Sequence, residues 1–549
     1  MPRLWAALWA LSFFHSALSA GTVSLGLEKR SLVNGGTQPA KGVYKRKASS
    51  GGSVGSTVFD VLPWGVGGAY YTNITVGSPP QTLTVILDTG SSDLYVDASA
   101  SAACKDTSSP FTCRGGSFDP SASQSYQVVD PNGFNTSFGD GSTATGDFGT
   151  DTVGIGNVVI QGVQLGVATD VVSTTGYAVS LMGVGYSYNE ASSRQYPNMP
   201  EVLQQAGAIS SRLYSIFLNS FGDATGTILF GGVDTSKYTG QLHTINVSPV
   251  QTRSGDIVYE FIIPVTGISG RINGQSTTYL SSTSQSSRRG SDSLQVLLDT
   301  GSTAWTVPPS LYTSLRDLFG DAIDSAGLLD CSHQQDDISI DIEFNGQVTI
   351  DVPASSFIIP VYDPTTNRQN TTASGQPLCA FMISPDVGNQ QLTQTGFLTM
   401  GDAVLRSMYV VFDMDNGQIA IAPANTNSTS ESDVRVVSAG PSGLAQAVSN
   451  SNGGIATADE NTYRIAPAIT ASQSLSFATA SSPVGTATGT FAIPQAGQVT
   501  PGQLDTTQAA AASSSGAAAS VVQYGEGRVG MTTIVLWTMM ACVGAVVLA

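Results

Sequence analysis

The sequence predicts an all-β protein of two lobes, related by a pseudo-twofold axis, with a cleft between them. At 549 residues the chain is too long for one ordinary domain. Its composition, with 60 glycines and only 11% charged residues, suits strands and turns better than helices. A motif that begins at Asp88 returns at Asp299, 211 positions later, as expected if each lobe carries one copy.

The repeated motif is an apolar run that leads into Asp-Thr-Gly-Ser. Residues 83–96 read LTVILDTGSSDLYV, and residues 294–308 read LQVLLDTGSTAWTVP. The apolar run predicts a strand through the core, and the glycine permits a tight turn beside the carboxylate. A single Asp-Thr-Gly also forms ordinary turns, but two copies in matching contexts indicate a shared site. The shared residues are Asp88, Thr89, Gly90 and Ser91 in the first copy and Asp299, Thr300, Gly301 and Ser302 in the second.

Two carboxylates that meet between the lobes cannot both ionise easily. One pKa falls and the other rises, so the pair shares a proton over an acidic range. The ionised Asp can then take a proton from a water molecule while the protonated Asp polarises a carbonyl group. We therefore expect hydrolysis at acidic pH with no cofactor. With only three histidines and no CxxC pattern, the chain gives little support to a metal site.

Residues 68–424 resemble the pepsin-like aspartic proteases, especially the fungal secreted and lipid-anchored members. The resemblance extends to YYTNITVGSPPQ at 70–81, SLMGVGY at 180–186, GTILFGGVDTSKYTGQL at 226–242 and the stretch 397–413. It implies the bilobal pepsin-like fold and an endopeptidase that acts on protein or peptide substrates. It also implies that Asp88 and Asp299 are catalytic and that Thr89 and Thr300 tie the two loops together. By the same resemblance, Ser91 and Ser302 place hydroxyls beside the carboxylates, and Thr303 faces the substrate.

The stretch TSFGDGSTAT at 136–145 resembles the family's flap, a hairpin that closes over the substrate. The flap residues are Phe138, Gly139, Asp140 and Gly141. The family normally has Tyr where this chain has Phe138 and Trp where it has Tyr95. In the family the flap Tyr reaches the Trp through its hydroxyl; here the only hydroxyl of the pair belongs to Tyr95.

The five cysteines and the sequons suit a secreted protein. Cys542 lies in an apolar tail, and the other four permit three pairings, of which Cys104 with Cys113 and Cys331 with Cys379 close the shortest loops. Sequons for N-linked glycans begin at Asn73, Asn135, Asn246, Asn370 and Asn427.

The two ends of the chain predict targeting and anchoring. Residues 1–20 are typical of a signal peptide, and the dibasic pairs that follow indicate a propeptide over 21–46. The lobes are expected at 68–245 and 246–424, followed by a flexible Ser/Thr-rich stalk over 425–513. Residues 514–549 match a glycolipid (GPI) attachment signal that is removed on maturation, although a terminal transmembrane helix is the alternative.

Composition also bounds the partners. The net charge of −18 argues against nucleic acid, and we expect a monomer on the outer face of the cell membrane or in the cell wall. Arg288 and Arg289 lie in a Ser-rich stretch that we interpret as a surface loop, with proteolytic processing as the alternative. A non-catalytic cell-wall binding protein on a protease scaffold is the second functional candidate, and a mainly structural glycoprotein is the third.

Overall fold

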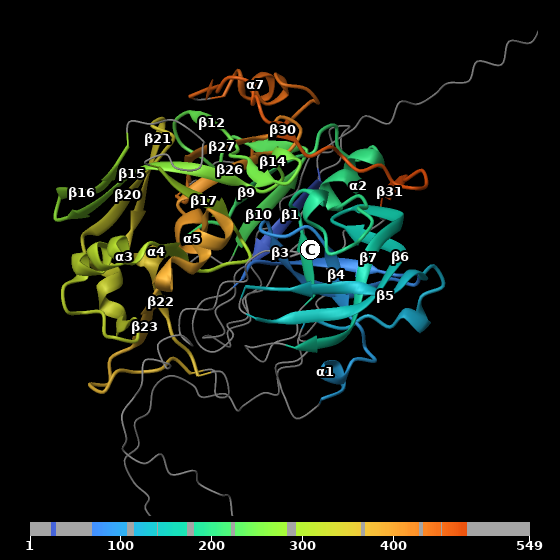
Figure 1. Cartoon of the computed structure of the whole chain (residues 1–549), viewed down its shortest axis with the longest axis horizontal. Helices are drawn as coiled ribbons and strands as arrows, with labels where there is room; N and C mark the ends of the chain where they lie inside the picture. The colour runs from blue at the N-terminus through green and yellow to red at the C-terminus, as the bar shows by residue number, and fades with distance from the viewer. Residues whose placement is uncertain are drawn as a thin grey trace, which may run out of the picture.

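The computed structural model places two β-sheet lobes side by side, with a third sheet shared between them (Figure 1). The structure describes 23–28 and 69–479, apart from 107–112, 114, 140, 173–179, 221–224, 283–292, 364–367, 428–431 and 452. The predicted signal peptide, the Arg288-Arg289 pair and the predicted GPI signal therefore lie outside the described residues, as does Asp140.

The N-terminal lobe is an eight-stranded sheet whose order is β31-β7-β4-β8-β3-β2-β6-β5. Its central strand β3 is buried along most of its length, which fits its run of apolar residues. The strands are β2 (Tyr71–Val76), β3 (Gln81–Asp88), β4 (Leu94–Asp97), β5 (Gln127–Ser137), β6 (Thr143–Ile155), β7 (Val158–Val172), β8 (Leu181–Gly183) and β31 (Phe477–Thr479).

The C-terminal lobe is built on a second eight-stranded sheet in the order β21-β20-β15-β17-β25-β18-β24, with β16 paired to β15. Strand β20 alternates buried apolar with more exposed polar residues, so one face of the sheet is covered and the other is solvated. The strands are β15 (Ile262–Ile272), β16 (Gln275–Ser281), β17 (Leu294–Leu298), β18 (Trp305–Val307), β20 (Ile338–Phe344), β21 (Val348–Pro353), β24 (Ile383–Pro385) and β25 (Leu398–Met400). A smaller sheet beside it joins β19 (Leu328–Asp330), β23 (Leu378–Phe381) and β22 (Ile358–Pro360).

The shared sheet draws strands from both halves of the chain, in the order β1-β10-β9-β26-β27-β12-β29. The predicted division of the lobes at 245/246 falls at the end of β12, inside this sheet. Its strands are β1 (Val23–Glu28), β10 (Thr225–Phe230), β9 (Leu213–Phe217), β26 (Met408–Asp413), β27 (Gln418–Pro423), β12 (Leu242–Asn246) and β29 (Ile455–Ala456).

Helices are short and lie at the edges of the sheets (Figure 1). The longest, α3, spans Pro309–Arg316 in the C-terminal lobe. The others are α1 (Ala102–Lys105), α2 (Met199–Gln205), α4 (Ala354–Phe357), α5 (Gln390–Thr395), α6 (Asp402–Leu405) and α7 (Gly443–Val448). No helix within the described part of the chain is long and apolar enough to cross a membrane.

An aromatic cluster joins the two lobes beneath the repeated motif. Tyr214 of β9 stacks on Phe412 of β26 with ring centroids 5.0 Å apart, and Phe261 lies 4.7 Å from Phe412. All three rings are almost completely buried. Since they come from the shared sheet and from the start of the C-terminal lobe, their packing fixes the two halves against each other.

The predicted stalk is wrong for residues 434–479, which are folded onto the lobes. Composition predicted that the whole of 425–513 could not bury enough apolar surface. However, Val437, Leu444 and Val448 are buried, and four short strands of this segment pair with strands from the rest of the fold. Edge strands of a preformed fold supply hydrogen-bond partners that a composition argument does not count. The rest of the predicted stalk, 480–513, lies outside the described residues.

The fold shows how the cysteines are paired and how far each sequon asparagine is exposed. Cys104 is bonded to Cys113 and Cys331 to Cys379, as expected. The sequon prediction is wrong at Asn73, which is buried in β2 and accepts a hydrogen bond from Thr84 Oγ1 at 2.7 Å. A glycan there has no space. Two of the other sequon residues, Asn135 and Asn427, are exposed, and two, Asn246 and Asn370, are partly buried.

Candidate active site

The two copies of the motif occupy equivalent places in the two lobes. In the N-terminal lobe, β3 ends at Asp88 beside the parallel strand β8, where Asp88 is paired with Gly183. In the C-terminal lobe, β17 runs parallel to β25, and the Asp299 amide donates to Met400 O at 3.1 Å. Each Asp thus leaves a central, buried strand at its carboxyl end. The apolar residues before each motif place these ends in the core.

The threonines hold the two loops together with four reciprocal hydrogen bonds. Thr89 Oγ1 donates to Leu298 O at 2.8 Å and accepts from the Thr300 amide at 3.0 Å. Thr300 Oγ1 donates to Leu87 O at 2.9 Å and accepts from the Thr89 amide at 3.1 Å. All partners are buried, so the bonds are shielded from competing water. These reciprocal bonds hold the two loops together and so fix the distance between Asp88 and Asp299, which directly precede the threonines.

The two carboxyls lie across the interface from each other's glycine. A Cβ built on Gly90 would be 2.7 Å from the carboxyl carbon of Asp299, and one on Gly301 would be 2.6 Å from Asp88 Oδ1. Any side chain at either glycine would collide with the carboxyl of the other lobe. Each glycine amide also donates to the Asp of its own loop, at 2.8 Å in both cases. The glycines therefore permit both the close approach and its hydrogen bonds.

Hydrogen bonding makes the two carboxyls unequal. Burial raises the pKa of Asp88 above its ordinary value, and hydrogen bonds from Asp299, Ser91 Oγ at 2.5 Å and the Gly90 amide offset only part of this rise, so neither pKa of the pair falls as the sequence predicted. Burial raises the pKa of Asp299 well above its ordinary value, and the negative charge of Asp88 raises it further. Asp299 is consequently the member that holds the proton, while Asp88 is the member that ionises first.

Ser302 does not repeat the role of Ser91. Its hydroxyl is directed at Ala304 O, 3.5 Å away, rather than at the Asp299 carboxyl. The equal sequences at these positions predicted hydroxyls beside both carboxylates, and the structure gives this arrangement only to Asp88. Thr303, expected to face the substrate, is 6% exposed at the end of the same loop.

The candidate flap is the hairpin between β5 and β6. The Phe138 amide donates to Ser142 O at 2.8 Å, and Gly141 takes a positive φ of 85° that suits glycine. The Phe138 ring lies 6.2 Å from the ring of Tyr95. The two residues that depart from the family pattern therefore meet each other. Gly139 is exposed at the turn.

A buried polar group behind the flap was missed from the sequence. Tyr196 donates its hydroxyl to Asp93 Oδ1 at 2.5 Å, and its ring lies 5.5 Å from Phe148 of β6. Burial raises the pKa of Asp93 to about 6 and, with the nearby charge of Asp93, that of Glu190 to about 10. The signal was present: the first motif has Asp93 where the second has Ala304. A carboxyl that occurs in only one of two equivalent loops indicates a hydrogen-bond partner that only that lobe provides.

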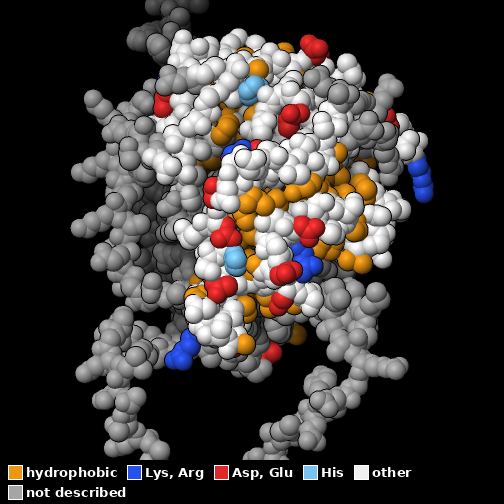
Figure 2. All heavy atoms as spheres, turned by 90° about the vertical axis from the view of Figure 1, so that its left-hand side faces the viewer, with side chains coloured by type: hydrophobic (Ala, Val, Ile, Leu, Met, Phe, Trp, Pro, Cys, Tyr) orange, Lys and Arg blue, Asp and Glu red, His pale blue; other side chains and the backbone are white. Residues whose placement is uncertain are grey.

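Clusters of metal-ligating side chains and of basic side chains bear on other kinds of site. The described ranges contain no group of three or more His, Cys, Asp and Glu side chains that could hold a metal ion. The face of the C-terminal lobe in Figure 2 carries acidic side chains among uncharged ones, with only isolated basic groups.

Comparison with known proteins agrees with this geometry. The chain is 36% identical over 372 residues to a probable aspartic-type endopeptidase (opsB) of Aspergillus oryzae, covering 66% of this chain and 70% of that one. It is 34% identical over 365 residues to an acid protease of Saccharomycopsis fibuligera, covering 65% and 80%. It is 32% identical over 372 residues to secreted aspartic protease 3 of Candida albicans, covering 66% and 81%.

A family model gives the assignment directly. The model described as eukaryotic aspartyl protease matches residues 69–424, which include both motifs, the candidate flap and all strands of the shared sheet except β1 and β29. The match ends just before the segment 434–479 that was expected to be a stalk. With its two Asp-Thr-Gly loops joined at the interface of two β-lobes, the chain belongs to the eukaryotic aspartyl protease family.

Proposed function

We propose that this chain, an aspartic-type endopeptidase, cleaves peptide bonds with a water molecule activated between Asp88 and Asp299. The observation that carries the proposal is the unequal pair of buried carboxyls held by the threonine bonds. A lone buried carboxyl would be protonated and inert, but a pair in which the pKa of Asp299 lies above that of Asp88 can accept and donate protons together.

In the proposed mechanism Asp88 is the base and Asp299 is the acid. Asp88 takes a proton from water as the water oxygen attacks the carbonyl carbon of the scissile bond. Asp299 donates its proton to the carbonyl oxygen, which gives a neutral tetrahedral diol. A proton then passes from the protonated Asp88 to the amide nitrogen, and the C–N bond breaks while Asp299 recovers its proton from a diol hydroxyl.

The candidate flap supports an extended polypeptide as the substrate. Strands β5 and β6 carry Phe138 toward Tyr95 and leave backbone groups at the tip for a peptide. Backbone pairing would hold many sequences, with side-chain preference decided elsewhere in the cleft. Both aspartates are present, which favours this reading over the non-catalytic binding protein.

We also propose that the enzyme is made as a secreted precursor and held at the cell surface by a GPI anchor. The disulfides suit an oxidising compartment. The Candida albicans relative is named a secreted protease. Strand β1 lies inside the predicted propeptide and pairs with β10 from Val23↔Phe230 to Glu28↔Thr225, so the propeptide would leave the shared sheet on activation. The monomeric state, the exposed glycans and the anchor itself remain proposals.

The test of the catalytic proposal is peptide cleavage by the secreted protein and two single variants. Asp88→Asn and Asp299→Asn should each lower kcat by at least about 10³-fold, since each removes one proton-transfer group. Asp321→Asn, at an exposed position, is the matched control and should leave kcat unchanged. Retained activity in either dyad variant, in a correctly processed and folded sample, would contradict the mechanism.

A further inference from the structure

The segment 434–479, which we call the strap, lies beyond the family match. Its four short strands pair with strands of four different sheets. Its strand β28 (Val434–Val436) pairs with β11 (Gly232–Asp234), and β29 extends the shared sheet at β12. Strand β30 (Arg464–Ile465) pairs with β14 (Gly255–Val258) of the three-stranded sheet β13-β14-β30, in which β13 is Val250–Thr252. Strand β31 then pairs with β7 of the N-terminal lobe. The strap therefore runs from one lobe to the other (Figure 1).

On the C-terminal side, the strap is fixed to β14 and to the ends of β12 and the β26–β27 turn. Buried Asn461 donates to Val247 O at 3.1 Å and to Gly417 O at 2.8 Å. The Ala466 amide donates to Val258 O at 2.8 Å. Three residues after Val258, Phe261 O accepts from the Leu298 amide at 3.1 Å, directly before Asp299.

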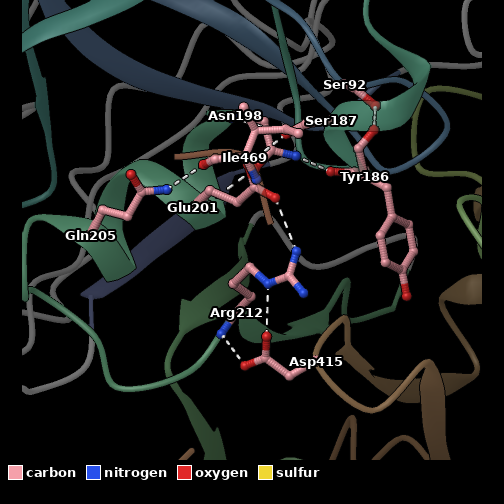
Figure 3. Close-up of polar contacts among 10 residues, drawn as sticks. Ser92, Tyr186, Ser187, Asn198, Glu201, Gln205, Arg212, Asp415 and Ile469 are labelled. Atoms are coloured by element: carbon pink, nitrogen blue, oxygen red, sulfur yellow. Dashed lines mark hydrogen bonds and ion pairs between the residues drawn. The ribbon is translucent and has the colours of Figure 1, made fainter. Parts of the chain in front are cut away.

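On the N-terminal side, the strap is fixed to helix α2 by two side chains. Gln205 donates to Ile469 O at 2.6 Å and accepts from the Ala471 amide at 2.8 Å. Glu201 Oε2 accepts from the Ile469 amide at 3.2 Å and from Ser187 Oγ at 2.7 Å. Figure 3 shows Glu201 and Gln205 on the same side of α2, both directed at Ile469.

Helix α2 is itself connected to the loop of Asp88. Asn198, the N-cap of α2, donates its side-chain amide to Gly185 O. The Gly185 amide donates to Ser91 O at 2.8 Å, and Ser91 holds the Asp88 carboxyl. The contacts from the strap thus reach the Asp88 carboxyl through Ser91 and, on the other side, the Leu298 amide directly before Asp299.

An ion-pair network joins α2 to the shared sheet as well. Arg212 Nη1 lies 3.0 Å from Glu201 Oε1, and its Nε lies 2.7 Å from Asp415 Oδ1 (Figure 3). Asp415 is in the turn between β26 and β27. One carboxylate oxygen of Glu201 therefore binds the strap, and the other binds Arg212, which is paired with the shared sheet. Docking of the strap is thus coupled to the position of the helix.

We infer that the strap is an interlobe tie for the peptidase, with Gln205 and Glu201 as positioning residues that set the two aspartate loops against each other through α2. This inference rests on the proposed catalytic function. It also implies that the smallest active form of the enzyme extends to about residue 479, not to the end of the family match at 424.

The test uses Gln205→Ala in the full secreted chain, with Gln204→Ala on the same helix as the matched control. Loss of both Gln205 hydrogen bonds should lower kcat by about 10-fold, since small shifts of reacting groups are costly, with KM changed by less than about 2-fold. Hydrogen exchange should quicken at Ala471 and at the Gly90 and Gly301 amides. If the tie matters only locally, exchange will quicken at the Ala471 amide alone and kcat will stay unchanged. That result would overturn the inference.

A second arm separates this inference from the catalytic proposal. A chain ending at 433 should be restored by a synthetic strap peptide of residues 434–479, whereas a chain ending at 479 should need no peptide. If the truncated chain fails to fold, the Gln205 variant still decides. If even the unmodified protein is inactive, the catalytic proposal fails, but exchange at Gly90 and Gly301 still reports on the tie: unchanged rates in Gln205→Ala would refute it.

Discussion

Ser91 and Ser302 occupy the same position in the two copies of the motif, yet their hydroxyls have different partners. Ser91 donates to Asp88 at 2.5 Å, while Ser302 is directed at a backbone carbonyl. A donor to a carboxylate stabilises the ionised form and lowers its pKa. One hydroxyl therefore helps to decide which aspartate ionises first.

The two serines allow a matched test of this asymmetry. In Ser91→Ala the pKa of Asp88 should rise, because the loss of the hydrogen bond destabilises the carboxylate. Asp88 acts as the ionised base, so the acidic limb of the kcat/KM profile should move to higher pH. The measurement is a pH profile of peptide cleavage. Ser302→Ala should leave the acidic limb in place; an equal shift in both variants would show that the hydroxyl of Ser91 has no special part.

At the scale of elements, the threonine bonds hold two loops that come from different sheets. Each Thr hydroxyl both donates to the other lobe's strand and accepts from the other lobe's loop. A buried amide and a buried carbonyl depend on each of them. Loss of the hydroxyl leaves both groups unpaired, which costs more than the bonds themselves contribute.

Thr300→Val should therefore lower the free energy of unfolding by about 2–4 kcal/mol, since two buried backbone groups lose their partners. It should also lower kcat, because the distance between the aspartates is no longer fixed. Urea unfolding monitored by fluorescence gives the first quantity and peptide cleavage the second. Thr300→Ser keeps the hydroxyl and should restore most of both. A Thr300→Ser variant as defective as Thr300→Val would mean that the methyl group, not the hydroxyl, matters.

Across the whole molecule, several carboxyls are buried away from the dyad. Burial raises their pKa values to about 6 for Asp93 and Asp413, about 7 for Asp97, and about 10 for Glu190. Each binds its proton more tightly in the folded chain than in the unfolded chain, where such groups titrate near pH 4. Their contribution to stability is full below about pH 4 and is lost as the pH rises through the folded-state values. Protonation of these carboxyls therefore stabilises the fold at acidic pH.

We expect the melting temperature to fall steadily between about pH 4 and about pH 7. Asp97→Asn should reduce that fall, because Asp97 is buried with no hydrogen-bond donor to either carboxyl oxygen. A rise in its pKa from near 4 to about 7 corresponds to roughly 4 kcal/mol of unfolding free energy across this range. Thermal scans at several pH values would measure it, with Asp321→Asn as control. A pH dependence identical to that of the unmodified protein would exclude Asp97 as a source.

The sequence by itself determined the fold class, the two lobes and the candidate dyad. It could do so because a repeated strand-plus-turn motif is local: the apolar run, the Asp and the glycine all lie within a few residues of each other. The cysteine pairs, 9 and 48 residues apart, were the pairing that closes the shortest loops. The family resemblance over 68–424 extended this to the flap, where it also marked Phe138 and Tyr95 as departures.

Only the tertiary structure decided which of two identical serines supports an aspartate, that Asn73 is buried, and that the strap is folded. Each of these depends on how the surrounding elements fold and pack, whether the partner is near in the chain, as for Ser302 and Asn73, or far away, as for the strap. The Ser302 hydroxyl is directed at Ala304 O in a loop packed on α6, and Asn73 lies opposite Thr84 on the adjacent strand. The strap forms hydrogen bonds with strands and a helix that the lobes hold in place. Composition measures what a segment can bury by itself; it does not register the edges and buried acceptors that a folded neighbour provides.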